Sequence, residues 1–93
     1  MSQQTTGKRP YPTPGYRVEE LDGEILLFNM SSQKILHINQ TGALVWKLCN
    51  GRRPVEEIVE LLQAAYPDMA GQISAEVPLI LNSLTEEGAL AWA

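Results

Sequence analysis

The sequence predicts an α+β domain in which a three-stranded antiparallel meander is followed by three helices. After residue 15, short apolar runs separated by polar turns come first, and amphipathic runs bounded by helix-starting and helix-ending residues come second. Short apolar runs with turn signals are typical of strands, whereas apolar residues spaced three and four apart are typical of helices. A chain of 93 residues has room for one domain with one modest core.

Residues 1–15 are predicted to form a disordered Pro-rich tail, and residues 16–93 the folded domain. Pro10, Pro12 and Pro14 lie close together in the tail, between glycines at both ends. Proline lacks an N–H and has a fixed φ, so it interrupts helices and the middle of sheets. The segment also has few apolar side chains with which to offset the entropy of ordering.

The three predicted strands cover residues 16–21 (YRVEEL), 24–29 (EILLFN) and 34–38 (KILHI). Asp22-Gly23 joins the first two and predicts a tight hairpin, because glycine accepts the positive φ of a type I′ turn. The polar residues MSSQ form the second turn. Consecutive strands with short turns between them predict an antiparallel meander.

The first two helices are bounded by clear signals. Asn39 or Thr41 is expected to cap the first helix, because both side chains can accept a hydrogen bond from a free N–H. Asn50-Gly51 is expected to end it, because both residues accept left-handed geometry. Pro54 is expected to start the second helix, where its missing N–H costs nothing, and Tyr66-Pro67 to end it.

The start of the third helix is predicted from the position of Pro78. Pro78 is tolerated in the first turn of a helix but not in its interior. The helix is therefore expected to begin near Ala75 and to end at Gly88, which leaves residues 68–73 as a loop. The last residues are predicted to be extended, with Trp92 packed onto the body of the domain.

Composition restricts the classes of partner. The net charge is −4, and nonspecific binding to nucleic acid depends on Lys and Arg side chains that displace counterions. The N-terminal residues contain no apolar signal-peptide segment, and no apolar run is long enough to span a bilayer. We therefore expect a cytoplasmic protein with neither nucleic acid nor membrane as its partner.

The side chains that carry chemistry are few and scattered. Cys49 is the only cysteine and His37 the only histidine, which excludes an intramolecular disulfide and disfavours a metal cluster. His37 lies within an apolar strand, and Cys49 lies on the apolar side of the first helix, where an inert buried thiol is the ordinary outcome. No acid, base and nucleophile cluster in the sequence, so we predict neither an enzyme nor a cofactor.

The order of strands and helices is also that of winged helix-turn-helix domains, some of which read DNA. Such a protein presents basic and amide groups on one helix to the major groove. The third predicted helix instead carries Glu76, Glu86 and Glu87, and contains no Lys or Arg. A winged-helix DNA-binding regulator is thus the alternative function rather than the preferred one.

The favoured function is peptide binding. The outer edge of the third strand is predicted to be unpaired, and an unpaired edge offers N–H and C=O groups to an added strand. The third helix has a second stripe beside its core face, made of Glu76, Leu79, Ser83 and Glu86. Leu79 is either a wall of the groove or simply a partly exposed neighbour of the core, and Glu86 is available to a basic ligand residue. Homodimerisation or protection by the tail would compete for the same edge.

Residues 35–62, with LNSLTEEGAL at 81–90, resemble the PqqD family. The matching features are Ile38-Asn39 entering the first helix, Trp46-Lys47-Leu48, Gly51 before Val55-Glu56-Glu57-Ile58, and Leu84 through Gly88-Ala89-Leu90. Members of the family are small proteins or domains that recognise leader peptides during the biosynthesis of ribosomally made, modified peptides. The namesake proteins have an arginine-rich first strand and a Pro-Glu-Gly turn, where this chain has YRVEEL and NMSSQK.

The resemblance implies a non-catalytic peptide chaperone with a winged helix-turn-helix-like fold. It would bind the leader of a precursor peptide as an added strand, between the third strand and the third helix. It would present the leader to a radical S-adenosylmethionine enzyme or another maturation enzyme, in the namesake pathway for pyrroloquinoline quinone. The implied peptide-binding residues are Gln33, Lys34, Ile35, Leu36, His37, Ile38, Glu76, Leu79, Ser83 and Glu86.

Overall fold

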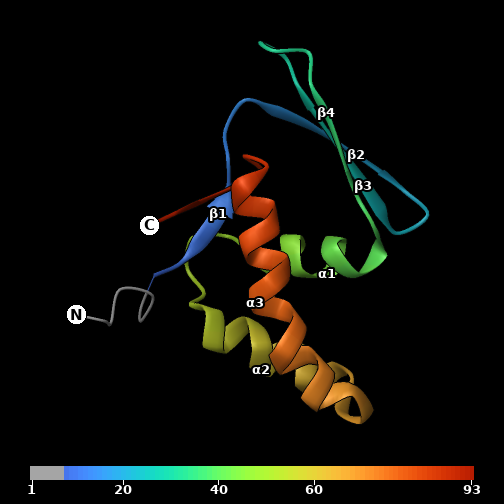
Figure 1. The fold of residues 1–93 in the computed structure, drawn as a ribbon, viewed down its shortest axis with the longest axis vertical. Coiled ribbons are helices and arrows are strands. Elements are labelled where there is room, and N and C mark those ends of the chain that lie inside the picture. The colour runs from blue at the N-terminus through green and yellow to red at the C-terminus, as the bar shows by residue number, and fades with distance from the viewer. Residues whose placement is uncertain (1–7) are drawn as a thin grey trace.

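The computed structural model describes residues 8–93, and this range contains two small sheets and three α-helices (Figure 1). The elements in chain order are β1 (Pro10–Pro12), β2 (Tyr16–Leu21), β3 (Glu24–Asn29), β4 (Ile35–Ile38), α1 (Gln40–Leu48), α2 (Val55–Ala65), a 3-10 turn (Pro67–Met69), α3 (Ala70–Glu86) and β5 (Leu90–Trp92). None of these helices combines the length and the apolarity that a membrane crossing requires.

The predicted meander is confirmed. Strands β2, β3 and β4 form an antiparallel sheet in that order, with β3 in the middle. The hairpin between β2 and β3 turns at Asp22 and Gly23, whose φ angles of 54° and 80° are both positive, as a type I′ turn requires. Ile25 and Leu27 of β3 are fully buried, so the sheet uses one face for the core.

The prediction of a disordered tail over residues 1–15 is wrong for Pro10–Pro12. These residues form β1, which pairs antiparallel with β5. Proline is acceptable there because β1 is an edge strand whose partner lies on one side only. The C=O group of Pro10 also accepts a hydrogen bond from the N–H of Gly51 at 2.8 Å. Residues 1–7, which the prediction also placed in the tail, lie outside the described residues.

The first two helices begin and end where the sequence predicts. Asn39 rather than Thr41 caps α1, because its side chain accepts a hydrogen bond from the N–H of Gly42 at 2.8 Å. Gly51 has a φ of 81° just after the helix. Pro54 is the N-cap of α2, and Tyr66 is its C-cap.

The predicted start of the third helix near Ala75 is wrong. Helix α3 begins at Ala70, so Pro78 lies in its interior and residues 68–73 are a 3-10 turn and the first helical turn rather than a loop. Pro78 removes one hydrogen bond to the C=O of Ser74. Both residues are exposed, and the additional turn packs Ile73 against the core. Tertiary packing therefore outweighs the local cost of the proline.

The core joins the sheet to all three helices. Fully buried side chains come from each part of the domain, and they include Ile25, Leu27, Val45, Ile58 and Leu81. Helix α3 contacts α1, α2 and β5, so it runs through the middle of the helical layer (Figure 1). The prediction that Trp92 packs onto the body is confirmed, because its indole N–H donates to the hydroxyl of Thr85 at 2.9 Å.

Cys49 is buried at the end of α1, with 2% of its surface exposed. Its thiol donates to the C=O of Val45 at a sulfur–oxygen distance of 3.3 Å. Burial raises the pKa of Cys49 to about 12, and the positive charge of Arg53 opposes this only in part. The neutral thiol is therefore the stable form, as the sequence predicts for an inert cysteine.

Replacing Pro78 with Ala should stabilise the protein. The change restores a helical hydrogen bond, whose gain exceeds the entropy that proline removes from the unfolded chain, and we expect a rise of about 1 to 2 kcal/mol in unfolding free energy. Urea unfolding followed by circular dichroism measures it. Asn82→Ala, one turn further on at an exposed position, serves as the control. An unchanged or lower stability of the Pro78→Ala protein would contradict the account of α3 given above.

Cys49 should resist alkylation in the folded state. The nucleophile is the thiolate, and a thiol with a pKa of about 12 has almost none of it at pH 8. Iodoacetamide should therefore label Cys49 quickly in concentrated urea and much more slowly in buffer at pH 8, as mass spectrometry can follow. Equal rates in the two solutions would show that the thiol is accessible and ionised.

Candidate peptide-binding site

The outer edge of β4 is unpaired in the part of the chain that the structure describes. Strand β4 lies at one side of the sheet, and only β3 pairs with it. The predicted free flank of the third strand is thus present. The small sheet formed by β1 and β5 is separate from it, so the described N-terminal residues do not cover this edge.

The register of β3 and β4 shows which backbone groups face outward. The N–H of Asn29 donates to the C=O of Lys34 at 2.8 Å, which identifies a hydrogen-bonded position of the ladder. Hydrogen-bonded and non-hydrogen-bonded positions alternate along an antiparallel pair. Leu36 therefore faces β3 with its backbone groups, whereas Ile35 and His37 direct theirs away from the sheet.

The β4–α1 connection forms one wall of a groove beside this edge. Ile38 ends β4, and Asn39 is the cap from which α1 begins. A Cβ atom on Gly42 would lie 2.8 Å from the Cγ2 atom of Ile38, so only glycine permits the helix to approach the strand this closely. His37, Ile38, Asn39 and Gly42 line this wall.

Helix α3 forms the opposite wall. Ile80, Ser83, Leu84 and Glu87 line it, and they recur at helical spacing on one side of the helix. The groove is therefore bounded by a strand edge on one side and by a helix on the other, as the sequence predicts.

The structure brings some of the predicted peptide-binding residues together and separates others. His37, Ile38 and Ser83 line the groove. Leu79 and Glu86 lie further round α3, pointing to solvent, and Leu79 is 66% exposed. Glu76 lines a neighbouring pocket instead. The remaining predicted residues lie on β4 or just before it and are exposed or half-buried: Gln33, Lys34, Ile35 and Leu36.

Sequence reasoning missed Ile80 and Glu87 as groove residues. Ile80 belongs to the apolar repeat of the third predicted helix, and Glu87 is one of the acidic residues of that helix. Ile80 lies four residues after Glu76, and Glu87 lies four residues after Ser83, so the helical repeat contained the signal. The helical repeat alone does not show from which direction β4 approaches α3.

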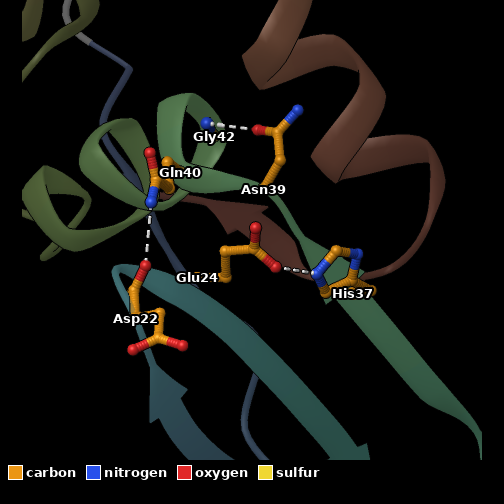
Figure 2. Close-up of polar contacts among 6 residues, drawn as sticks. All are labelled: Asp22, Glu24, His37, Asn39, Gln40 and Gly42. Carbon is orange, nitrogen blue, oxygen red and sulfur yellow. Dashed lines mark hydrogen bonds and ion pairs between the residues drawn. The ribbon is translucent and has the colours of Figure 1, made fainter.

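A hydrogen bond crosses the outer face of the sheet beside the edge. The Nε2 atom of His37 lies 2.5 Å from Oε1 of Glu24 on β3 (Figure 2). His37 and Glu24 are 13 residues apart in the chain and become neighbours only through the pairing of β3 with β4. The pair holds the imidazole over the sheet, next to the backbone groups that face outward.

Two further contacts attach the sheet to α1. The Gln40 side-chain amide donates to the C=O of Asp22 at 2.9 Å, which ties the hairpin turn to the start of the helix (Figure 2). Lys47 pairs with Glu20 of β2 at 2.8 Å. Both contacts join the sheet to α1 next to the short β4–α1 connection, which lines the groove.

An apolar pocket adjoins the groove. It lies between α1, the end of α2 and the first half of α3, and Ile80 lines both the pocket and the groove. Leu44, Tyr66 and Met69 contribute partly exposed side chains to it. A ligand that pairs with β4 therefore has an apolar site within reach.

Residues 8–93 contain no group of three or more His, Cys, Asp or Glu side chains that is placed to hold a metal ion. Ser83 and His37 both line the groove, but within residues 8–93 no hydrogen bond joins the Ser83 hydroxyl to the imidazole, whose partner is Glu24. Its arrangement suits non-covalent binding of an extended chain.

Two solved structures share this fold. "TbiB1 in Complex with the TbiA(beta) Leader Peptide" aligns with a TM-score of 0.72 and 19% identity, over 86% of this chain and 93% of that one. "Structure of the heterocyclase TruD" aligns with a TM-score of 0.67 and 21% identity, over 92% of this chain. The match covers only 12% of the TruD chain. Identities this low establish the fold alone.

The sequence comparison is more specific. No curated protein matches the chain. The family model described as "Coenzyme PQQ synthesis protein D (PqqD)" matches residues 24–90, from the first residue of β3 to the first residue of β5. The match includes β4, α1 and α3, which together build the groove. Because it spans well over half of the chain, the protein belongs to the PqqD family.

Proposed function

We propose that this protein is a non-catalytic peptide chaperone for a ribosomally made precursor peptide. It binds the leader as an added strand on β4 and presents it to a maturation enzyme. The observation that carries the proposal is the unpaired edge of β4, which lies next to a groove lined by α3. An unpaired edge supplies main-chain hydrogen bonds to an added strand, and neighbouring pockets supply selectivity.

The backbone of the leader pairs with the outward N–H and C=O groups of Ile35 and His37. Side chains of the added strand alternate between the groove and solvent, because successive residues point to opposite faces. The groove residues Ile80 and Leu84 favour an apolar leader side chain, and Glu87 favours a basic one nearby. A larger apolar side chain extends past Ile80 into the adjoining pocket.

The comparisons support the class of ligand and of partner. The TbiB1 structure contains a leader peptide, and TruD is a heterocyclase. We infer that the partner here is also a peptide-modifying enzyme, either a radical S-adenosylmethionine enzyme or one of another class. The description of the family model supports pyrroloquinoline quinone synthesis as the pathway. The contact set of the proposal is the β4 edge with the groove-facing side of α3, and Leu79 and Glu86 lie at its outer rim.

DNA binding is not favoured by any feature of the groove. No Lys or Arg lines it, and Glu87 would repel a phosphate backbone. Pairing of two β4 edges in a homodimer would occupy the same backbone groups as the leader. Excess leader should therefore dissociate such a dimer.

Replacing His37 with Pro should weaken leader binding much more than replacing it with Thr. Both changes remove the imidazole, but only proline removes the outward N–H. Leaving a buried acceptor unsatisfied costs about 1 to 3 kcal/mol, so we expect the Kd of His37→Pro to be at least about fivefold above that of His37→Thr. Isothermal titration calorimetry with the leader of the precursor encoded near the gene measures both values.

Thermal unfolding of both variants controls for damage to the sheet. Position 37 is the right place for this test, because a proline there faces away from β3. A proline at Leu36 would remove a hydrogen bond to β3 and unfold the strand. Equal affinities of the proline and threonine variants would rule out strand addition at this edge.

Ser83→Phe and Leu79→Glu distinguish the groove from the outer side of α3. Ser83 lines the groove, so a phenylalanine there fills the space that a leader side chain needs. Leu79 is exposed and does not line it. We expect an affinity loss of about tenfold or more for Ser83→Phe and little change for Leu79→Glu, because steric exclusion at a groove outweighs a change at its rim. The reverse order would move the binding surface to the outer stripe that contains Leu79.

A further inference from the structure

A second groove lies between α2 and α3, next to β5. Its floor is apolar and is formed by Val55 and Val59 of α2, Leu81 of α3 and Trp92 of β5. Glu56 and Glu60 stand along the α2 side. An apolar floor beside polar residues is typical of surfaces that bind another protein segment.

The charge of this α2–α3 groove is uncompensated. No Lys, Arg or His is among the residues that line it. Within residues 8–93, Glu56 and Glu60 form neither an ion pair nor a side-chain hydrogen bond, whereas their neighbour Glu57 pairs with Arg53 at 3.7 Å. Two unpaired carboxylates one helical turn apart attract a ligand with cationic side chains at matching spacing.

Trp92 gives the groove a rigid aromatic wall. Its indole N–H is held by the hydroxyl of Thr85, and its backbone is held in register opposite Pro10 by the β1–β5 pairing. Tryptophan is among the residues that dominate protein interfaces, and its ring face attracts Lys and Arg side chains. Because the ring is already fixed, binding would order few additional groups.

The α2–α3 groove and the peptide groove use opposite sides of α3. Pro78, Leu81 and Asn82 line the former, and Ile80, Ser83 and Glu87 line the latter. Figure 1 shows β1 on one side of α3, and α1 with the larger sheet on the other. A ligand in one groove therefore leaves the other accessible.

We propose that the α2–α3 groove is a docking site for a cationic amphipathic segment of the maturation enzyme. The apolar side of that segment covers Val59 and Trp92, and its Lys or Arg side chains reach Glu56 and Glu60. The choice of the maturation enzyme as the owner of the segment rests on the proposed function. Docking here would hold the enzyme on the protein while the leader occupies β4.

The first experiment tests the chemistry of the groove. The probe is a short synthetic amphipathic helix of Leu and Lys, titrated into ¹⁵N-labelled protein. The indole N–H resonance of Trp92 should shift, whereas that of Trp46, which donates to the C=O of Ala89 in the core, should not. An analogue with Glu in place of Lys should not bind. Shifts confined to His37 and Ser83, or equal binding of the acidic analogue, would overturn the proposal.

Matched variants test the two carboxylates. Removal of two exposed charge interactions should weaken probe binding about five- to tenfold in Glu56→Gln/Glu60→Gln. Asp22→Asn/Asp68→Asn removes the same net charge at exposed positions outside both grooves and should retain the affinity. An equal loss of probe affinity in the two double variants would show that the probe responds to net charge alone, and it would overturn the proposed site.

The last experiment separates this inference from the proposed function. The Glu56→Gln/Glu60→Gln protein should bind the leader with unchanged affinity, and its affinity for the purified maturation enzyme should fall by the same five- to tenfold factor as for the probe. Normal enzyme binding by this variant would overturn the docking site while leaving leader binding in place. Loss of leader binding instead would show that the leader itself occupies the α2–α3 groove, which would also overturn the proposal.

Discussion

The close approach of α1 to the end of β4 is the constraint on which the groove depends. A single residue, Asn39, separates the strand from the helix, and it caps that helix with its own side chain. Gly42 allows the first turn to pack on Ile38, where any Cβ atom would clash with a buried side chain. This packing fixes the orientation of β4, so its outer edge stays outside the core. The edge is left beside α3, at a separation set by buried residues rather than by flexible loops.

Helix α3 has three sides with three different surroundings. Its buried side carries Val77, Leu81 and Leu84 into the core. A second side faces β4 and a third faces the α2–α3 groove, and each is reached from a different direction. A helix of this length can line two grooves and still contribute to the core, because its side chains repeat about every 3.6 residues. In the proposed function, this division lets so small a domain hold a peptide and remain available to an enzyme.

Most of the fold follows from local signals. Asp22-Gly23, Asn39, Gly51 and Gly88 each end or begin an element at the predicted position, because each meets a backbone requirement that few other residues meet. The two predictions that the structure contradicts have a common cause. Pro10–Pro12 and Pro78 oppose their observed structures locally, and they are overruled by partners distant in sequence, namely β5 for the first and the core around Ile73 for the second. Local propensity depends on neighbouring residues in the chain and therefore gives no information about those distant partners.

The sequence by itself determined the α+β class, the meander, the caps of the helices, the edge position of β4 and the resemblance to the PqqD family. Each of these depends on residues close together in the chain or on a pattern along it. Tertiary structure alone decided that Ile80 and Glu87 line the groove beside β4, that His37 meets Glu24, and that Trp92 lines a second groove. Those arrangements depend on the angles at which strands and helices pack, and such angles are set by the shapes of buried side chains acting together.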